Sequence, residues 1–511
     1  MQRGEGTASA VPFFVALTAI VLVALLRVAA TYHVFGQVFD EPAHVACGVE
    51  LVSTGRYTLE PQHPPLARLA IGLTARASLP PDGTVWQRGN AILYAGDYVR
   101  NLASARSGIL LFLAIAIVVT WSWARRLYGD RLALVAALLV STTPALLAHS
   151  GLATTDAAVA AMTLLALDRF SRWRQAMTPR NALFLGITVA LAVTAKFSAL
   201  LFLPAGFVAI LIACHRSAGR EPALARRLLI SASLSAVAFF ITAWAVYLFA
   251  PDALGRAVEG LRVALAHERG GHPAYLLGRM SPDGFWYFFL VAFAVKMPLA
   301  TIALILAAAA RRKLDEPAAV TAAFFLATLP VHVAIGFRHI LPVVPFVAML
   351  AAAGAGYLAR HRLGLVFAAL LVAWQVVATT LAHPHYLAYF NEAAASHPDF
   401  FLVDSDLDWG QDILLLGSAV GPTTQPLTVA YFGTADPHRH IRVPFRYLHA
   451  GEEPFGWIAL SETILRKGKP PGRFAFLDTA SYRMIGRSIR LYYRRDNRRS
   501  DNGAAAAVKR P

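Results

Sequence analysis

The sequence has few charged residues and very few cysteines. Only 15% of its 511 residues are Asp, Glu, Lys or Arg, whereas soluble chains carry about 25%. This scarcity excludes an ordinary soluble enzyme, and the 57% of hydrophobic residues excludes a disordered chain. The two cysteines, Cys47 and Cys214, are too few for a disulfide framework, and the topology predicted below places them at opposite membrane faces.

Acidic residues are scarcer than basic ones, with 30 Asp and Glu against 47 Lys and Arg, which leaves a formal charge of +17. Such an excess is compatible with nucleic-acid binding. In so apolar a chain, however, positive charge is better explained by cytoplasmic loops and by contact with lipid headgroups. The sequence therefore predicts a polytopic α-helical membrane protein that contacts membrane lipids and has no nucleic-acid partner.

Long apolar stretches predict about 11 transmembrane helices, because about 20 apolar residues are needed to cross a bilayer core. The first has no small-residue cleavage site behind it and ten more follow, so we expect it to be retained rather than removed as a signal peptide. The predicted spans lie near residues 12–32, 105–124, 131–148, 152–168, 182–195, 197–214, 229–250, 286–310, 318–336, 340–358 and 363–382.

The distribution of arginine predicts the orientation, because cytoplasmic loops are enriched in Lys and Arg. With the N-terminus in the cytoplasm, the short outer connections hold only Lys196 and Arg338. Two long loops, about 33–104 and 251–285, then lie outside. The predicted inner loops hold Arg125, Arg126 and Arg131, then Arg169, Arg172, Arg174 and Arg180, then Arg216, Arg220, Arg226 and Arg227, then Arg311, Arg312 and Lys313, and finally Arg360 and Arg362.

The remainder of the chain is less apolar and predicts a small extracytoplasmic α/β domain over residues 383–493, after a transmembrane domain over residues 1–382. Residues 489–493 alternate Ile, Leu and Tyr with Arg and Tyr, which indicates a strand with one buried and one solvated face. Residues 494–511 are basic and then alanine-rich, and we predict a disordered tail. Further strands are predicted at Phe400–Val403, Leu427–Phe432 and Trp457–Leu460.

The first outer loop opens with the sequence FDEPAH, residues 39–44, which contains two adjacent carboxylates. Adjacent helical residues point about 100° apart, so Asp40 and Glu41 would need different roles. Asp40 could act as a general base while Glu41 positions it. From these residues alone a helix N-cap is the commoner explanation for Asp40. His44 could share a helix face with Asp40, but two ligands are too few for a metal, and a hydrogen-bonding histidine is favoured.

Other polar residues are expected near the outer face. The two prolines of QHPPLARL, residues 62–69, predict the start of an amphipathic helix that lies on the membrane. This helix would place His63, Arg68 and Arg76 at headgroup depth, where contact with anionic lipid is favoured for the two arginines. His438 and His440 are expected to be structural.

Asp156 is expected near the outer start of the fourth span, either as an N-cap or facing the protein interior. Cations recur at helix mouths on the same side, at Lys196, Lys296, Arg338 and His339. Several such cations would satisfy one phosphate at the membrane surface, and snorkelling to ordinary lipid phosphate is the alternative.

The order of the motifs resembles bacterial polyprenyl-phosphate-dependent glycosyltransferases of the GT-C type, family 39-like, related to protein O-mannosyltransferases and to the lipid A aminoarabinose transferase. The resemblance covers nearly the whole chain. The motifs that carry it are FDEPAH, QHPPL, TTDAA, the run from Gly271 to Leu299, GFRHILPVVPF, HPHYLAYFNE, DSDLDWGQD and YFGTADP.

This resemblance implies a sugar donated from undecaprenyl or dolichyl phosphate at the outer face of a bacterial inner membrane. It implies that Asp40 is the catalytic residue, with Glu41 as its partner, rather than a simple helix cap. It further implies that Asp156 and His44 serve the acceptor or a polar network. Relatives often have a lysine that contacts the donor phosphate where this chain has His63. The candidates for this contact are therefore His63 and, as alternatives, Lys196, Arg338 and His339, with Lys296 as a further candidate cation. No obligatory metal is predicted.

We therefore predict an inverting glycosyltransferase in which Asp40 activates a hydroxyl of a protein, lipid or glycan acceptor. The alternative is a membrane transporter or lipid exporter. Transporters tend to have repeated halves, broken helices and polar sites near the midplane of the membrane. Here the ionisable residues gather instead at the outer ends of the helices.

Overall fold

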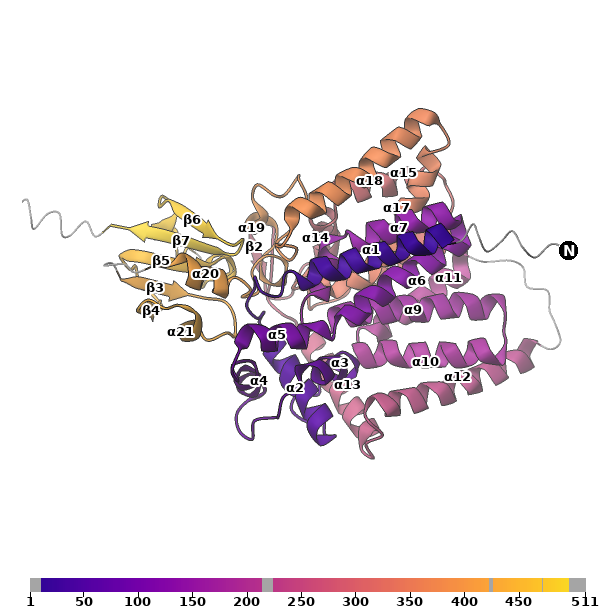
Figure 1. The fold of residues 1–511 in the computed structure, drawn as a ribbon, viewed down its shortest axis with the longest axis horizontal. Coiled ribbons are helices and arrows are strands. Elements are labelled where there is room, and N and C mark those ends of the chain that lie inside the picture. The colour runs from indigo at the N-terminus through magenta and orange to yellow at the C-terminus, as the bar shows by residue number, and fades with distance from the viewer. Residues whose placement is uncertain (1–10, 214–223, 422–425, 471, 496–511) are drawn as a thin grey trace, which may run out of the picture.

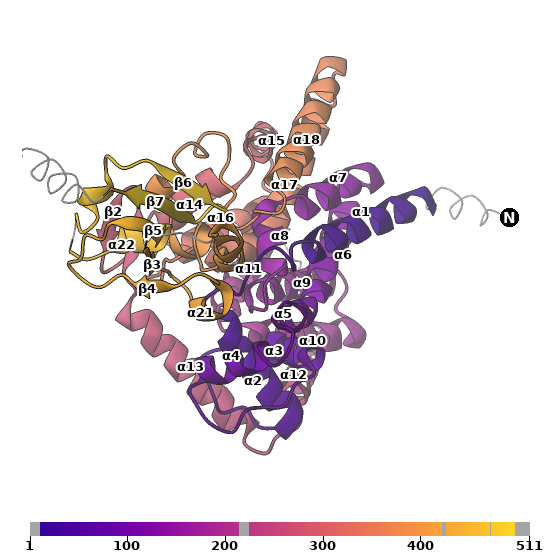
Figure 2. The ribbon, with the colours of Figure 1, turned by 60° about the vertical axis from the view of Figure 1, so that its left-hand side comes forward.

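The computed structural model describes residues 11–213, 224–421, 426–470 and 472–495. Most helices run side by side along the long axis of the molecule, and the larger sheet lies at one end (Figure 1). The predicted outer loops, 33–104 and 251–285, lie toward that end, and the helices α2, α3 and α13 lie together in both views (Figures 1 and 2). Cys214, Arg216, Arg220 and the predicted tail beyond residue 495 lie outside the described residues.

The first half of the chain is helical. Its elements are α1 (Val11–Ala29), α2 (Glu41–Thr54), α3 (Leu66–Ala75), α4 (Val85–Leu93), α5 (Tyr98–Ser107), α6 (Leu110–Tyr128), α7 (Asp130–Ser141), α8 (Pro144–Ser150), α9 (Asp156–Gln175), α10 (Pro179–Ala195), α11 (Ala199–Ala213), α12 (Leu224–Val246) and α13 (Ala253–Gly270).

The second half continues with helices and then becomes mixed. Its elements are β1 (Ala274–Leu276), β2 (Arg279–Ser281), α14 (Phe288–Lys296), α15 (Leu299–Ala309), α16 (Glu316–Thr328), η1 (Phe337–Val343), α17 (Val344–Leu358), α18 (Arg362–Ala382), α19 (Pro398–Phe401), η2 (Asp404–Asp406), α20 (Ile413–Ala419), β3 (Leu427–Ala430), α21 (Pro437–His440), β4 (Phe445–Tyr447), β5 (Gly456–Ser461), α22 (Glu462–Lys467), η3 (Ala475–Leu477), β6 (Tyr482–Ile485) and β7 (Ile489–Arg494).

Several helices are long and apolar enough to cross a membrane. Within the described residues there are five, or up to seven if each of two bent pairs is one span. The bent pairs are α7 with α8, at 61°, and α14 with α15, at 112°, and a proline begins or precedes the second helix of each pair. Because proline has no N–H to donate, it ends the preceding helical hydrogen bonding. Every predicted span overlaps a helix, but the count of 11 is not confirmed. The helices α10, α11 and α16 are shorter than 18 residues, and α9 is not among the helices that are long and apolar enough.

The exposed apolar side chains show which helices would face lipid. Only about a fifth of the apolar windows of α1, α12 and α18 is buried, against 89% of the window that contains α17. Large apolar residues such as Leu26 on α1 and Leu363 on α18 are more than two-thirds exposed. A helix that is apolar all round belongs in a membrane or in a core, so α17 lies in the protein core and the other three form its lipid-facing surface.

The larger sheet has five strands in the order β4-β3-β5-β7-β6. The strand β3 pairs in parallel with β4 and β5, whereas β7 pairs antiparallel with β5 and β6. The strands predicted around Leu427 and Trp457, and the one over residues 489–493, are confirmed by β3, β5 and β7. The strand predicted at Phe400–Val403 is wrong, because Pro398 begins the short helix α19 there.

Both faces of this sheet are covered, which corrects the prediction of one solvated face. Ile489 and Leu491 of β7 pack into one apolar cluster, whereas Tyr492 packs on the opposite face. Phe474 and Leu477, which follow α22, cover that second face. The alternation in the sequence correctly separated the two faces, but it could not show that a later segment covers the second one.

Candidate active site

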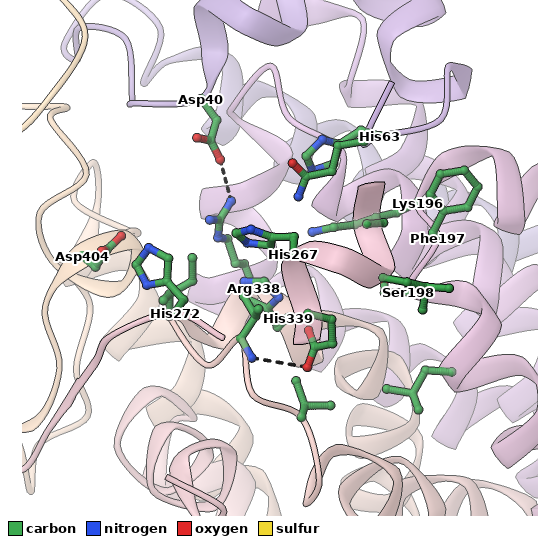
Figure 3. A pocket seen from close by; sticks show the side chains of 18 of the residues that line it. Asp40, His63, Lys196, Phe197, Ser198, His267, His272, Arg338, His339 and Asp404 are labelled. Carbon is green, nitrogen blue, oxygen red and sulfur yellow. Dashed lines mark hydrogen bonds and ion pairs between the residues drawn. The ribbon is translucent and has the colours of Figure 1, made fainter. Parts of the chain in front are cut away.

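A cavity of about 770 Å³ lies where the predicted outer loops meet the helices. One part of its wall is polar, with Asp40, Lys196, Arg338 and His339 (Figure 3). The rest is largely apolar, with residues from α11, α13, α14 and α16 that include Leu200, Leu201, Leu261, Leu265, Phe289 and Ala327. A small charged group and an attached apolar chain could therefore share this cavity.

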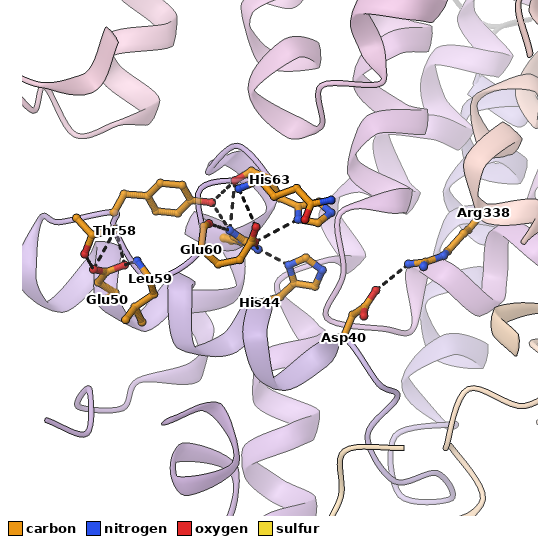
Figure 4. Close-up of polar contacts among 11 residues, drawn as sticks. Asp40, His44, Glu50, Thr58, Leu59, Glu60, His63 and Arg338 are labelled. Carbon is orange, nitrogen blue, oxygen red and sulfur yellow. Dashed lines mark hydrogen bonds and ion pairs between the residues drawn. The ribbon is translucent and has the colours of Figure 1, made fainter. Parts of the chain in front are cut away.

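Asp40 occupies the N-cap position of α2, but its side chain makes no capping hydrogen bond. Instead, its Oδ2 accepts a hydrogen bond of 2.9 Å from Nη1 of Arg338 (Figures 3 and 4). The side chain of Asp40 is 28% exposed, compared with 10% for Arg338. The carboxylate is therefore directed at the cavity and its cations rather than used to cap the helix.

Arg338 also belongs to a chain of charges that leads deeper into the protein. Its Nη1 lies 3.9 Å from Oδ2 of Asp156, and Oδ1 of Asp156 accepts a 2.6 Å hydrogen bond from Nζ of Lys196. Asp156 is only 1% exposed, so its carboxylate needs these cations to be stable. Asp40, Asp156, Lys196 and Arg338 together carry no net formal charge.

Hydrogen-bond donors remain available in this chain of charges. An ammonium group has three N–H donors and a guanidinium has five, and the bonds above use only some of them. Nε of Arg338 and Nε2 of His339 are buried without a hydrogen-bond partner among the described residues. The unused donors of Lys196 and Arg338 beside the cavity are suited to an anionic oxygen.

Glu41 points away from the cavity and is fully buried. Its two carboxylate oxygens accept hydrogen bonds of 2.7 and 2.8 Å from Arg106. They also accept the backbone N–H groups of Val38 and Ala153, at 2.8 Å each. Glu41 therefore ties the residues just before Asp40 to α5 and to the segment that precedes α9, and it does not line the cavity.

Replacing Glu41 with glutamine is expected to destabilise the protein by about 3–5 kcal/mol, because Arg106 would keep a buried, unpaired charge. The measurement is thermal unfolding of the detergent-solubilised protein. A double variant, Glu41→Gln with Arg106→Met, removes both charges and should lose less. An unchanged unfolding temperature for Glu41→Gln alone would contradict this role.

The loop after α2 is built around a buried arginine, Arg68. Nε of Arg68 donates a 3.0 Å hydrogen bond to Nδ1 of His44, and its Nη1 donates to the hydroxyl of Tyr57 at 2.7 Å. Its Nη2 pairs with the carboxylate of Glu60, which also contacts Nδ1 of His63 at 3.2 Å. Arg68 has no exposed surface, so the predicted contact with anionic lipid is wrong for this residue.

Close contact between α2 and α3 brings these residues together. A Cβ atom on Gly48 would lie 2.3 Å from the carbonyl oxygen of Arg68, and one on Gly72 would lie 2.1 Å from that of Gly48. Only glycine permits this backbone contact. A buried carboxylate, Glu50, then accepts the N–H groups of Thr58 and Leu59 and fixes the turn before Glu60 (Figure 4).

The hydrogen bonds define the charge states of both histidines of this loop. Burial and the neighbouring Arg68 lower the pKa of His44 well below its usual value, so its Nδ1 accepts from Arg68 and its Nε2 carries the proton. Burial also lowers the pKa of His63. Burial opposes the ionisation of Glu60, but Arg68 and His63 outweigh it and lower the pKa of Glu60. Neutral His63 therefore donates from Nδ1 to Glu60.

His63 lines the cavity, but in this tautomer its Nε2 is an acceptor and offers no proton to a phosphate. We therefore do not assign it a phosphate contact. Its partner in the loop, His44, also lines the cavity and presents a donor at Nε2. His44 is thus suited to an acceptor or sugar oxygen, as the prediction of a polar-network role requires.

The structure does not support a phosphate role for Lys296, because this residue does not line the cavity. Its Nζ donates hydrogen bonds of 2.7 Å to the carbonyl oxygens of Leu387 and Asp406. It also lies 4.4 Å from the ring centre of Phe390. Lys296 therefore joins the helical region to the segment after α18, a contact that no local sequence pattern could reveal.

Sequence reasoning missed several cavity residues. Asp404, Trp409 and Lys467 line the cavity from the far end of the chain, and Nζ of Lys467 lies 3.0 Å from Oδ2 of Asp404. The motif DSDLDWGQD, which contains Asp404 and Trp409, was a usable signal, since four carboxylates in nine residues are unusual in so weakly charged a chain.

His440, expected to be structural, pairs its Nε2 with the hydroxyl of Tyr94 at 2.9 Å.

No group of three or more His, Cys, Asp or Glu side chains in the described part of the chain is arranged to hold a metal ion. The prediction that no metal is obligatory stays a prediction.

Residues 15–256 match the family model described as dolichyl-phosphate-mannose-protein mannosyltransferase. No curated protein matches the chain. Among solved structures, ArnT from Cupriavidus metallidurans in the apo state is similar with a TM-score of 0.51 and 14% identity, over 95% of this chain and 98% of that chain.

The same protein bound to undecaprenyl phosphate gives a TM-score of 0.49 and 13% identity, over 96% of this chain and 98% of that chain. A further similar structure is the oligosaccharyltransferase AglB from Archaeoglobus fulgidus, in complex with an inhibitory peptide and a dolichol-phosphate. Its TM-score is 0.43 and its sequence identity 14%, over 83% of this chain and 65% of that chain. The predicted resemblance is thus confirmed by the family model over residues 15–256, and the fold of apo ArnT extends over nearly the whole chain.

Proposed function

We propose that this protein is a membrane glycosyltransferase that moves a sugar from a polyprenyl-phosphate donor to a hydroxyl group at the outer membrane face. The observation that carries the proposal is the cavity in which the carboxylate of Asp40 faces Arg338, with Lys196 and His339 beside an apolar wall. The family model that matches residues 15–256 is named for an enzyme with a lipid-phosphate sugar donor, which agrees with this chemistry.

The donor phosphate fits the cationic part of the cavity. Lys196, Arg338 and His339 supply N–H donors there, and the adjacent wall of Leu200, Leu201 and other apolar residues suits a polyprenyl chain. When the bond between sugar and phosphate breaks, the leaving polyprenyl phosphate gains a second negative charge. Fixed cations that are already in place stabilise this developing charge without reorganisation.

The acceptor reaction fits Asp40. Its carboxylate takes the proton from the acceptor hydroxyl while the hydroxyl oxygen bonds to the anomeric carbon. The bond from that carbon to the phosphate oxygen breaks, and the electron pair leaves with polyprenyl phosphate. A single displacement of this kind inverts the anomeric centre. Glu41 takes no proton in this scheme, and we assign it the positioning role that its buried pairing with Arg106 supports.

Arg338 couples the two halves of the reaction. Without donor its Nη1 is bonded to Oδ2 of Asp40, which occupies the carboxylate that the acceptor hydroxyl needs. A donor phosphate that attracts Arg338 would weaken that bond and leave Asp40 available to the acceptor. We therefore propose that the donor binds before the acceptor is activated.

We propose the following arrangement in the membrane. The N-terminus is cytoplasmic in a bacterial inner membrane, and about 11 spans form a transmembrane domain over residues 1–382. Residues 383–493 form an extracytoplasmic domain, and residues 494–511 are a tail. The gathering of the predicted outer loops near the sheet supports this orientation (Figure 1).

The test uses purified protein in liposomes with labelled undecaprenyl-phosphate mannose or arabinose. Membranes from cells that lack the protein serve as the acceptor source. We expect released undecaprenyl phosphate, detected by mass spectrometry, and label in the acceptor fraction. Movement of the intact donor across the bilayer, without release of undecaprenyl phosphate, would instead support a transporter or lipid exporter.

A further inference from the structure

The segment from Asp404 to Asp412 contacts Arg338 and the residue just before Asp40, although it lies far from Asp40 in the sequence. On the side of Asp40, the N–H of Phe39 donates to the carbonyl oxygen of Trp409 at 2.9 Å. The carbonyl oxygen of Phe39 accepts a 2.9 Å hydrogen bond from the hydroxyl of Thr434. Both backbone groups of the residue before Asp40 are therefore held from the C-terminal part of the chain.

On the side of Arg338, the same segment holds the start of η1. The carboxylate of Asp406 accepts the N–H of Phe337 at 3.0 Å, and the hydroxyl of Ser405 donates to the carbonyl oxygen of Ile335 at 3.0 Å. Gly336 lies between them, where a Cβ atom would be 2.2 Å from Oγ of Ser405. Ser405 therefore packs closely against Gly336, and the two hydrogen bonds hold the backbone that leads to Arg338.

The Trp409 side chain completes the connection. The guanidinium carbon of Arg338 lies 4.2 Å from the centre of a Trp409 ring, which is a favourable cation–π distance. Trp409 is only 2% exposed and packs in a small apolar cluster with Val38 and Leu152. Its ring therefore has a fixed position and restricts where the guanidinium can lie.

We propose that Trp409 is a positioning residue for the transfer reaction. It acts through Arg338: its ring holds the guanidinium between Asp40 and the donor phosphate, while its carbonyl oxygen fixes the backbone before Asp40. The C-terminal part of the chain thus supplies a component of the active site rather than only covering it. This proposal rests on the proposed function.

The experiment compares Trp409→Phe and Trp409→Leu in the liposome assay. A phenylalanine ring can still stack on Arg338, so Trp409→Phe should retain most of kcat. Trp409→Leu should lower kcat about 10-fold, which is the size expected for loss of a desolvated cation–π contact. Trp457→Leu is the matched control, because Trp457 packs on Tyr493 in the sheet, and it should leave kcat unchanged.

A double-mutant cycle separates positioning from general packing. If Trp409 acts through Arg338, Trp409→Leu should have little further effect when Arg338 is already glutamine. Equal effects of Trp409→Leu in both backgrounds, or a Phe variant as impaired as the Leu variant, would overturn the proposal. Unfolding temperatures of all variants identify any loss that comes from misfolding, and Trp409→Phe keeps the test decisive if the leucine variant does not fold.

Binding of undecaprenyl phosphate alone provides a readout that does not depend on transfer. Trp409→Leu should weaken this binding several-fold, and Trp409→Phe should not. If the wild-type protein binds the lipid phosphate but transfers no sugar, the proposed function fails while the role of Trp409 in holding Arg338 is still measured. If the wild type transfers sugar and Trp409→Leu changes neither binding nor kcat, the positioning proposal fails alone.

Discussion

Replacing Asp40 with asparagine is expected to lower the rate of sugar transfer about 1000-fold. A positioned general base contributes roughly 10²–10⁴-fold to a rate, and asparagine has nearly the same shape but cannot take a proton. The measurement is kcat in the liposome assay with labelled undecaprenyl-phosphate sugar. Because Asp40 is partly exposed and makes no capping hydrogen bond, the variant should fold and insert normally.

The affinity of the Asp40→Asn variant for the donor should not fall with its transfer rate. Asparagine has no charge to hold Arg338, so the guanidinium becomes more available to the donor phosphate. We expect the Kd for undecaprenyl phosphate to stay the same or to fall. Asp82→Asn is the matched control, because Asp82 is an exposed carboxylate in the same outer loop. Transfer by Asp40→Asn within 10-fold of the wild-type rate would exclude Asp40 as the base.

Replacing Arg338 with glutamine is expected to have the second-largest effect, a loss of about 10²–10³-fold in kcat, as found when a transition-state donor is removed. Glutamine keeps some length and a hydrogen-bond donor but loses the charge that opposes the developing dianion. Asp40 would also lose its ion-pair partner, so the carboxylate would no longer be held in one position. Both kcat and donor affinity should fall.

Arg338→Lys restores the charge but not the planar guanidinium that spans Asp40 and Asp156, so it should recover only part of the activity. Arg76→Gln is the control, because Arg76 is an exposed arginine in the same outer loop as Asp40. If Arg338→Gln bound and used the donor like the wild type, the phosphate would have to bind elsewhere in the cavity.

Two lysines that the sequence placed on the same side of the membrane have different contacts in the structure. Lys196 directly follows one predicted span and Lys296 interrupts another, and both were expected on the same outer side. Only Lys196 lines the cavity. The helix α14 brings Lys296 against two carbonyl oxygens, which satisfy it internally. The sequence shows that a cation is present at a helix end, whereas its partner is decided by the packing of distant segments.

The two adjacent carboxylates of the first loop also separate what the local sequence predicts from what the packing decides. Helical geometry predicted that Asp40 and Glu41 point in different directions, and in the structure only Asp40 lines the cavity. The partner of Glu41, Arg106, lies 65 residues away and had no role assigned from the sequence. Direction along a helix is a local property, but the identity of the partner is not.

By itself, the sequence determined the positions of the apolar helices, three strands of the sheet and the places where polar residues interrupt apolar ones. Hydrophobic periodicity and chain breakers act over a few residues, so these features can be seen locally. Only the tertiary structure decided that Asp40 meets Arg338 across 298 residues and that Trp409 stacks on that arginine. Such contacts depend on how whole helices and the sheet pack together, and no local pattern contains that information.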